Sequence, residues 1–163
     1  MEKGEGTDHD PFAPGNGGVM NLIIGIAVIV AGSICWVGQA LSFFTPAMAA
    51  KLGVCEAEGE IDPVLYLIET KAHGLTDTAL TWTLPLSALL MILNVSVWPI
   101  LALIGGGIYL YFPGLIVLNR VFLKRHGRNV GKASSEYGAY VFGCIWIISA
   151  TAMITLAIRE ISA

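Results

Sequence analysis

Long apolar segments that contain no ionisable side chain dominate this sequence of 163 residues. A helix needs about 20 apolar residues to cross the hydrocarbon core of a bilayer, which is roughly 30 Å thick. The first and last of these segments each fit one such helix, and the middle one is long enough for two. Asp, Glu, Lys, Arg and His are all absent between Asp10 and Lys51, between Asp77 and Arg120, and between Glu136 and Arg159.

This pattern predicts an all-α polytopic membrane protein, a four-transmembrane-helix bundle formed by residues 19–163. Spans two and three are expected to form a central helical hairpin, because Asn94 and Ser96 mark a turn and Pro99 is tolerated in the first turn of a helix. Pro85 and Pro113 lie inside spans and are expected to kink them. The predicted spans cover about 19–44, 75–93, 97–118 and 137–158.

The polar segments between these spans differ in charge. Residues 1–18 are predicted to form a flexible acidic tail, and they lack the basic region of a cleaved signal peptide, so the first span is expected to be retained. The loop at 45–75 is acidic in its middle and then amphipathic at VLYLIET, which we expect to lie flat as a short helix in the head-group region. An ordinary solvated loop would explain the acidic run about as well as a segment at the membrane surface. The run consists of Glu56, Glu58, Glu60 and Asp62.

Composition agrees with this interpretation. The chain is 55% hydrophobic and only 13% charged, with a mean hydropathy of +0.72, whereas soluble domains carry roughly 25% charged residues. Its charges gather in clumps, which a soluble helix or strand would not tolerate. The net charge of −3 belongs to loops and tails and gives no indication of nucleic-acid binding.

The distribution of basic residues predicts the orientation. Short loops rich in Lys and Arg remain in the cytoplasm, and acidic residues carry little weight. Loops 45–75 and 119–136 are therefore expected to be cytoplasmic, and both termini outside. The two loops hold seven of the nine basic residues (Lys51, Lys71, Arg120, Lys124, Arg125, Arg128 and Lys132), against Lys3 and Arg159 on the other side.

Three segments resemble parts of small bacterial four-span membrane proteins. They are the acidic run that ends at Asp62–Pro63, the stretch from Asp77 through Trp82 to Pro85, and the glycine-rich sequence GGGIYLYF. The resemblance implies no activity. We expect the chain to lie in a bacterial-type inner (plasma) membrane.

The predicted spans contain no charged side chain near their centres. Proton-coupled pumps and exchangers require a titratable group within the membrane, and small multidrug exporters carry a glutamate in their first span, so both classes are disfavoured. Asp77 and Arg120 are the charged residues closest to the hydrocarbon, at the start of span two and the end of span three. We expect them to form an ion pair, which either fixes the register of the hairpin or contributes to a substrate or lipid head-group site.

Two further groups are candidates for interaction. Small residues in span three are expected to allow close helix packing, or alternatively to form a hinge; they are Ala102, Gly105, Gly106 and Gly107. The basic loop is expected to contact anionic lipid head groups or a cytoplasmic partner, through Arg120, Lys124, Arg125, Arg128 and Lys132.

No catalytic, cofactor or metal motif occurs in the sequence. Cys35, Cys55 and Cys144 are isolated, and His73 and His126 fall in predicted loops, which is unfavourable for haem ligation within a bundle. The favoured function is therefore a non-catalytic accessory, assembly or scaffold subunit of a larger membrane complex. The alternatives are a homo-oligomeric channel or facilitator for a small solute, and a membrane enzyme of redox or lipid chemistry.

Overall fold

The computed structural model describes residues 16–163, and this range is helical without any strand. Four of its helical stretches are long and apolar enough to cross a membrane: Gly18–Phe44, Pro63–Ile92, Trp98–Arg125 and Ala133–Ile161. The chain is therefore an integral membrane protein with the predicted four-helix architecture. Its elements are α1 (Asn16–Phe44), α2 (Pro46–Lys51), α3 (Pro63–Leu67), a π-helical turn (Ile68–His73), α4 (Gly74–Leu80), α5 (Thr83–Ile92), α6 (Trp98–Arg125) and α7 (Ala133–Ile161).

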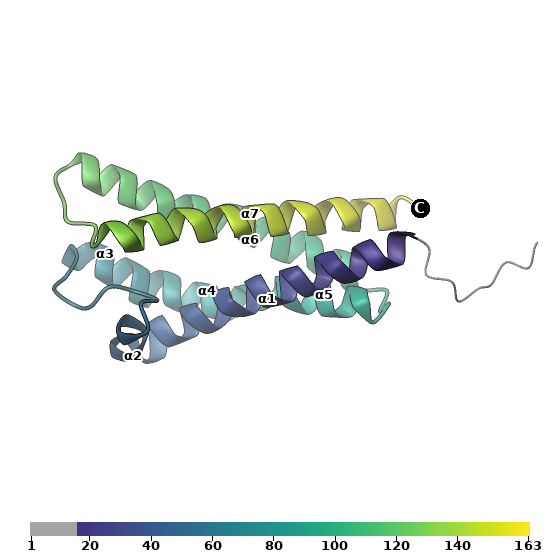
Figure 1. Cartoon of the computed structure of the whole chain (residues 1–163), viewed down its shortest axis with the longest axis horizontal. Coiled ribbons are helices and arrows are strands. Elements are labelled where there is room, and N and C mark those ends of the chain that lie inside the picture. The colour runs from purple at the N-terminus through teal and green to yellow at the C-terminus, as the bar shows by residue number, and fades with distance from the viewer. Residues whose placement is uncertain (1–15) are drawn as a thin grey trace, which may run out of the picture.

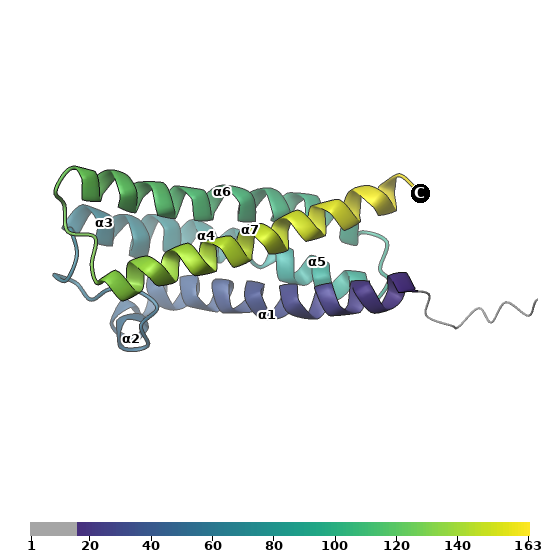
Figure 2. The same ribbon diagram turned by 45° about the horizontal axis from the view of Figure 1, so that its top comes forward.

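The bundle has two different ends (Figure 1). The start of α1, the C-terminus and the turn at residues 93–97 lie together at one end, which we call the turn end. The linkers at 45–62 and 126–132 lie at the opposite end, which we call the loop end. Figure 2 shows α7 running obliquely across the bundle in front of α1 and α6.

The second long helix is composite and begins earlier than the sequence pattern predicted. Asp62 caps its start, because its carboxylate accepts hydrogen bonds from the backbone N–H groups of Val64 (2.9 Å) and Leu65 (3.4 Å), and Pro63 occupies the first turn. The segment VLYLIET therefore does not form a separate helix at the membrane surface. It continues through the π-helical turn into α4, so the helical stretch runs from Pro63 to Ile92.

A break at Thr81 and Trp82 separates α4 from α5. Pro85 lacks the N–H group that would bond the carbonyl of Thr81, four residues earlier. The Tyr109 hydroxyl donates to that carbonyl instead, at 3.0 Å. The Trp36 indole donates to the carbonyl of Thr78, at 2.9 Å. Side chains thus satisfy carbonyls around the break, which is required where no water is available to do so.

The α5–α6 hairpin turn contains Asn94, the one non-glycine residue with positive φ (54°) in the described range. Asn tolerates this conformation better than most residues. The backbone N–H of Val95 then bonds the carbonyl of Leu90 at 3.0 Å, and the N–H of Trp98 bonds that of Val95 at 3.0 Å. These bonds satisfy the helix ends and start α6 directly after the turn.

Packing at the turn end is close because α6 presents small residues to its neighbours. A methyl group added at Gly105 would lie 2.7 Å from the backbone nitrogen of Leu84 in α5, and one added at Gly106 would lie 2.5 Å from the Ile154 side chain in α7. Ala102 is fully buried, whereas Gly107 faces open space. The backbones therefore approach closely on two faces of α6.

Candidate functional site

A cavity of about 570 Å³ lies at the loop end, between α1, α6, α7 and the linker that follows α2. Its wall also includes Glu69 and His73 of the π-helical turn. The indole of Trp146 in α7 donates to the carbonyl of Ala31 in α1 at 3.3 Å. From this contact toward the loop end the two helices diverge (Figure 1), and the cavity occupies the space between them.

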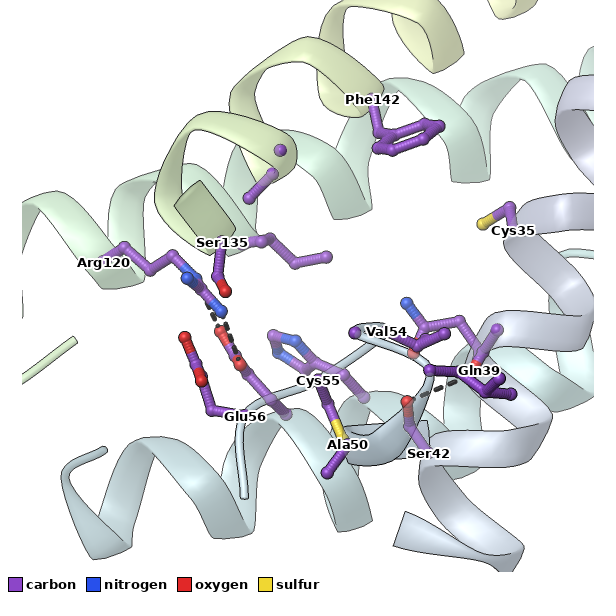
Figure 3. A pocket seen from close by; sticks show the side chains of 18 of the residues that line it. Cys35, Gln39, Ser42, Ala50, Val54, Cys55, Glu56, Arg120, Ser135 and Phe142 are labelled. Carbon is purple, nitrogen blue, oxygen red and sulfur yellow. Dashed lines mark hydrogen bonds and ion pairs between the residues drawn. The ribbon is translucent and has the colours of Figure 1, made fainter. Parts of the chain in front are cut away.

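One part of the cavity is apolar and lies deeper in the bundle. Trp146 is stacked against Phe142, with ring centroids 5.8 Å apart, and tilted against Phe112, at 5.3 Å. Figure 3 shows Phe142 and Cys35 facing each other at this inner part of the cavity. The apolar lining comprises Ile34, Pro113, Ile116, Phe142 and Trp146.

The other part is polar, and its central interaction is a buried ion pair between Arg120 and Glu69. Arg120 Nε lies 2.9 Å from Glu69 Oε1, and Arg120 Nη2 lies 2.8 Å from Oε2, so the pair is bidentate. Arg120 Nη1 donates to the carbonyl of Val130 at 3.4 Å. All three nitrogens of the guanidinium are therefore hydrogen-bonded, and Arg120 is only 5% exposed.

This pairing corrects two predictions. Arg120 does not pair with Asp77, because the early start of the second helix brings Glu69 to the level of Arg120 and leaves Asp77 two turns deeper. Arg120 is also too deeply buried to contact lipid head groups as predicted. The other basic residues of that loop remain exposed, and three of them form ion pairs: Lys124 with Glu136, Arg128 with Asp62, and Lys132 with Glu60 and Glu56.

The acidic linker and the basic linker therefore bind each other across the cavity mouth. Lys132 Nζ lies 2.9 Å from Glu60 Oε2 and 3.9 Å from Glu56 Oε2. The hydrogen bond from Lys132 lowers the pKa of Glu60, and the same bond raises the pKa of Lys132. Glu56 is only 3% exposed, and its Oε1 accepts the backbone N–H of Lys132 at 2.8 Å.

Asp77 occupies a different environment from the one that the sequence predicted. It is the fifteenth of the 30 residues of the second helix, so it lies at the middle of that helix rather than at its edge. It is 6% exposed, and its Oδ2 has no hydrogen-bond partner. The nearby hydroxyls of Thr81 and Tyr109 donate to backbone carbonyls instead. The prediction that no charged residue lies near the centre of a span is therefore wrong for the second helix.

The predicted cysteine and histidine candidates are dispersed. His73 lines the cavity, whereas His126 is exposed at the end of α6, where its ring nitrogen lies 2.8 Å from the carbonyl of Phe122. Cys35 and Cys55 line opposite parts of the cavity, and Cys144 is exposed. Burial raises the pKa of the Cys55 thiol, which keeps it protonated at neutral pH. Within residues 16–163 no group of three or more His, Cys, Asp or Glu residues is placed to hold a metal ion.

The sequence did not predict the cavity, the pairing of Glu69 with Arg120 or the burial of Glu56 in the cavity wall. A signal for Glu69 was present, because Glu69, His73 and Asp77 follow one another at intervals of four residues. Residues at this spacing share one face of a helix. Treating residues 63–75 as a helix would have shown the polar stripe.

Comparison with known proteins adds no further constraint: no protein-family model matches the chain, and neither a curated protein nor a solved structure does so. The functional conclusion therefore rests on the geometry described above.

Proposed function

We propose that this chain is a non-catalytic membrane protein that binds an amphipathic small molecule in the cavity between α1 and α7. The cavity combines an apolar inner part with a polar part at the loop end. A bilayer has the same order of environments, hydrocarbon inside and head groups at the surface. A single-chain amphiphile would place its chain against Phe142 and Trp146 and its head group near the linkers.

The observation that carries this proposal is a set of unused polar groups in the cavity wall. Among the described residues, the side chains of Gln39, His73 and Ser135 line the cavity and form no hydrogen bond with the protein. Polar groups converging on an apolar pocket are the usual composition of a small-molecule site, and the volume falls within the usual range of about 300–1,000 Å³.

The predicted accessory role is compatible with this binding site. The short linkers leave little of the chain outside the membrane, and the bound molecule would then serve or stabilise a larger membrane complex. We place the loop end in the cytoplasm of a bacterial-type inner membrane, as the distribution of basic residues predicts. The head group would accordingly lie at the inner leaflet.

The channel alternative is less favoured than this binding role. It was motivated by the glycine run of span three and by the kinked helices. Gly105 and Gly106 instead pack against α5 and α7, and none of the three glycines lines the cavity.

The test is native mass spectrometry of the affinity-purified protein, extracted from native membranes in a mild detergent. We expect a bound species of small-molecule mass. Gly138 lines the cavity and has no atom within 4 Å of an added methyl group, so Gly138→Leu should fill the cavity without distorting α7 and remove the bound species.

Gly107→Leu is the matched control, because it also places a side chain in open space, but outside the cavity. Retention of the small molecule by Gly138→Leu would contradict the proposed site. The same spectra test the accessory role: a co-purified protein in fixed stoichiometry supports it, and a lone monomer or homo-oligomer contradicts it.

A further inference from the structure

The charges in the cavity wall do not balance. Three carboxylates line the cavity (Glu56, Glu60 and Glu69), against two permanently cationic side chains (Arg120 and Lys132). Figure 3 shows Glu56 beside the Arg120 ion pair at the polar part of the cavity. The balance of these groups decides which head group the site accepts.

The charge of Arg120 is already neutralised. Its guanidinium forms a bidentate pair with the Glu69 carboxylate and donates to the carbonyl of Val130. An anionic head group would have to share this guanidinium with Glu69 and would lie beside the Glu56 carboxylate, which repels it. A phosphate or carboxylate head group is therefore disfavoured.

Lys132 neutralises only one carboxylate well. Its ammonium is hydrogen-bonded to Glu60 at 2.9 Å and is 3.9 Å from Glu56, beyond hydrogen-bond distance. The Lys132 side chain is also 63% exposed, so water screens its charge. Glu56 is 3% exposed, and its charge is the least compensated in the cavity wall.

We infer that the cavity selects amphiphiles with a cationic, amine-type head group, and that Glu56 is the residue that determines this selection. Glu56 Oε1 already accepts the backbone N–H of Lys132, so an ammonium would add a hydrogen bond at Oε2 and a closer positive charge than Lys132 provides. Gln39, His73 and Ser135 provide further hydrogen-bonding groups in the same wall. This inference rests on the proposed function, because it requires that an amphiphile occupies the cavity.

The test uses the full chain in nanodiscs of phosphatidylcholine at neutral pH. Three twelve-carbon amphiphiles, each with the same photoactivatable diazirine in the chain, differ only in their head group: primary amine, hydroxyl or phosphate. Cross-linked positions are mapped by mass spectrometry. Labelling at Phe142 and Trp146 is divided by labelling at Ile148, which is exposed on α7 outside the cavity, so that differences in membrane partitioning cancel.

We expect the amine to label the cavity about tenfold more than the hydroxyl compound, as one charge-assisted hydrogen bond would give, and the phosphate to label it least. Glu56→Gln should abolish the preference while retaining labelling by the hydroxyl compound. Glu58→Gln removes an exposed carboxylate of the same linker that does not line the cavity, and should change nothing.

A second variant protects the test against misfolding of Glu56→Gln. Lys132→Met removes the exposed ammonium that competes for Glu56, and should increase the preference for the amine. Equal labelling by all three compounds, or a preference that persists in Glu56→Gln with native folding, would overturn the inference and leave the proposed function standing. Labelling of Phe142 and Trp146 no stronger than that of Ile148 for every compound would overturn both.

Discussion

The two halves of this bundle are held together by different means. At the turn end, α5, α6 and α7 are in direct contact through small residues such as Ala88, Ala102 and Ala157, all fully buried. At the loop end, α1 and α7 diverge, and charged side chains from the linkers and from α6 bridge the space around a cavity. Close packing brings the backbones of α5 and α6 together at Gly105, whereas ionic bridging at the loop end maintains structure around an open volume.

The comparison distinguishes two kinds of packing along one helix. Gly105 of α6 fits against the backbone of Leu84, so its side chain cannot be enlarged without displacing α5. Residues of α6 near the loop end, such as Pro113, Ile116 and Arg120, line the cavity. We therefore expect substitutions in the two halves to have different effects, which the following measurements can test.

The largest effect is expected at the buried ion pair of the loop end. Arg120→Met leaves Glu69 buried without its partner, and breaking such a pair typically costs about 3–5 kcal/mol of unfolding free energy. Lys124→Met is the matched control, because its partner Glu136 is also a glutamate but Lys124 is 60% exposed, and exposed pairs contribute little to stability.

Both variants are compared by equilibrium unfolding in detergent micelles. The double variant Arg120→Met with Glu69→Met should recover most of the loss, since it removes both charges. Equal destabilisation by Arg120→Met and Lys124→Met would show that the ionic bridge does not maintain the loop end.

A smaller loss is expected from overpacking the turn end. Gly105→Leu forces its side chain into the backbone of Leu84, and overpacking of this kind costs about 1–3 kcal/mol. Gly107→Leu, two residues along the same helix, meets no atom and should be neutral or stabilising, because leucine favours a helix over glycine. Thermal unfolding in the same detergent distinguishes the two; similar melting temperatures would contradict close packing at Gly105.

The smallest effect is expected at the exposed pair between Glu60 and Lys132. The pKa of Glu60 is lowered in the folded protein, so its contribution to stability is present above its ordinary value of 4.5 and is lost as pH falls through the folded pKa. The pKa of Lys132 is raised, so the pair also weakens as pH rises through that folded pKa. Glu60→Gln should lower the melting temperature slightly at neutral pH and not at all in acid.

The measurement is the difference in melting temperature between the wild-type chain and Glu60→Gln, from acid to neutral pH. This difference should shrink as the pH falls. High salt should diminish the difference at neutral pH, because both groups are exposed to solvent. A difference that grows toward acid pH would contradict the pairing.

The helical fold could be predicted from sequence because apolar length alone determines it. A segment without charges for 20 residues or more has no stable alternative to a membrane helix. Residues 63–74 fall in the predicted loop at 45–75, where only VLYLIET was expected to be helical and Glu69, Lys71 and His73 interrupt the apolar pattern. In the structure this stretch is nevertheless helical, with a proline start, an Asp62 cap and a buried face at Leu65 and Thr70.

The candidate site could not be predicted in the same way. Asp77 and Arg120 were paired because both appeared to lie at one membrane surface, and a shift in one helix start was enough to exchange Asp77 for Glu69. The cavity depends on the angle between α1 and α7, which no motif in the sequence encodes. Hydropathy likewise does not reveal that Asp77 lies at the middle of its helix, because it stands at the end of an uncharged segment.

The π-helical turn at Ile68–His73 has a rotational consequence. Such a turn holds more residues than an α-helical turn, and each residue of an α-helix rotates the side-chain direction by about 100°. The turn therefore rotates the side chains of Asp62 and Leu65 about the helix axis relative to those of Asp77 and Thr81. All four belong to the same continuous helical stretch or its cap. An insertion or deletion within it would change this angular offset and turn the capped segment away from the linker that it contacts.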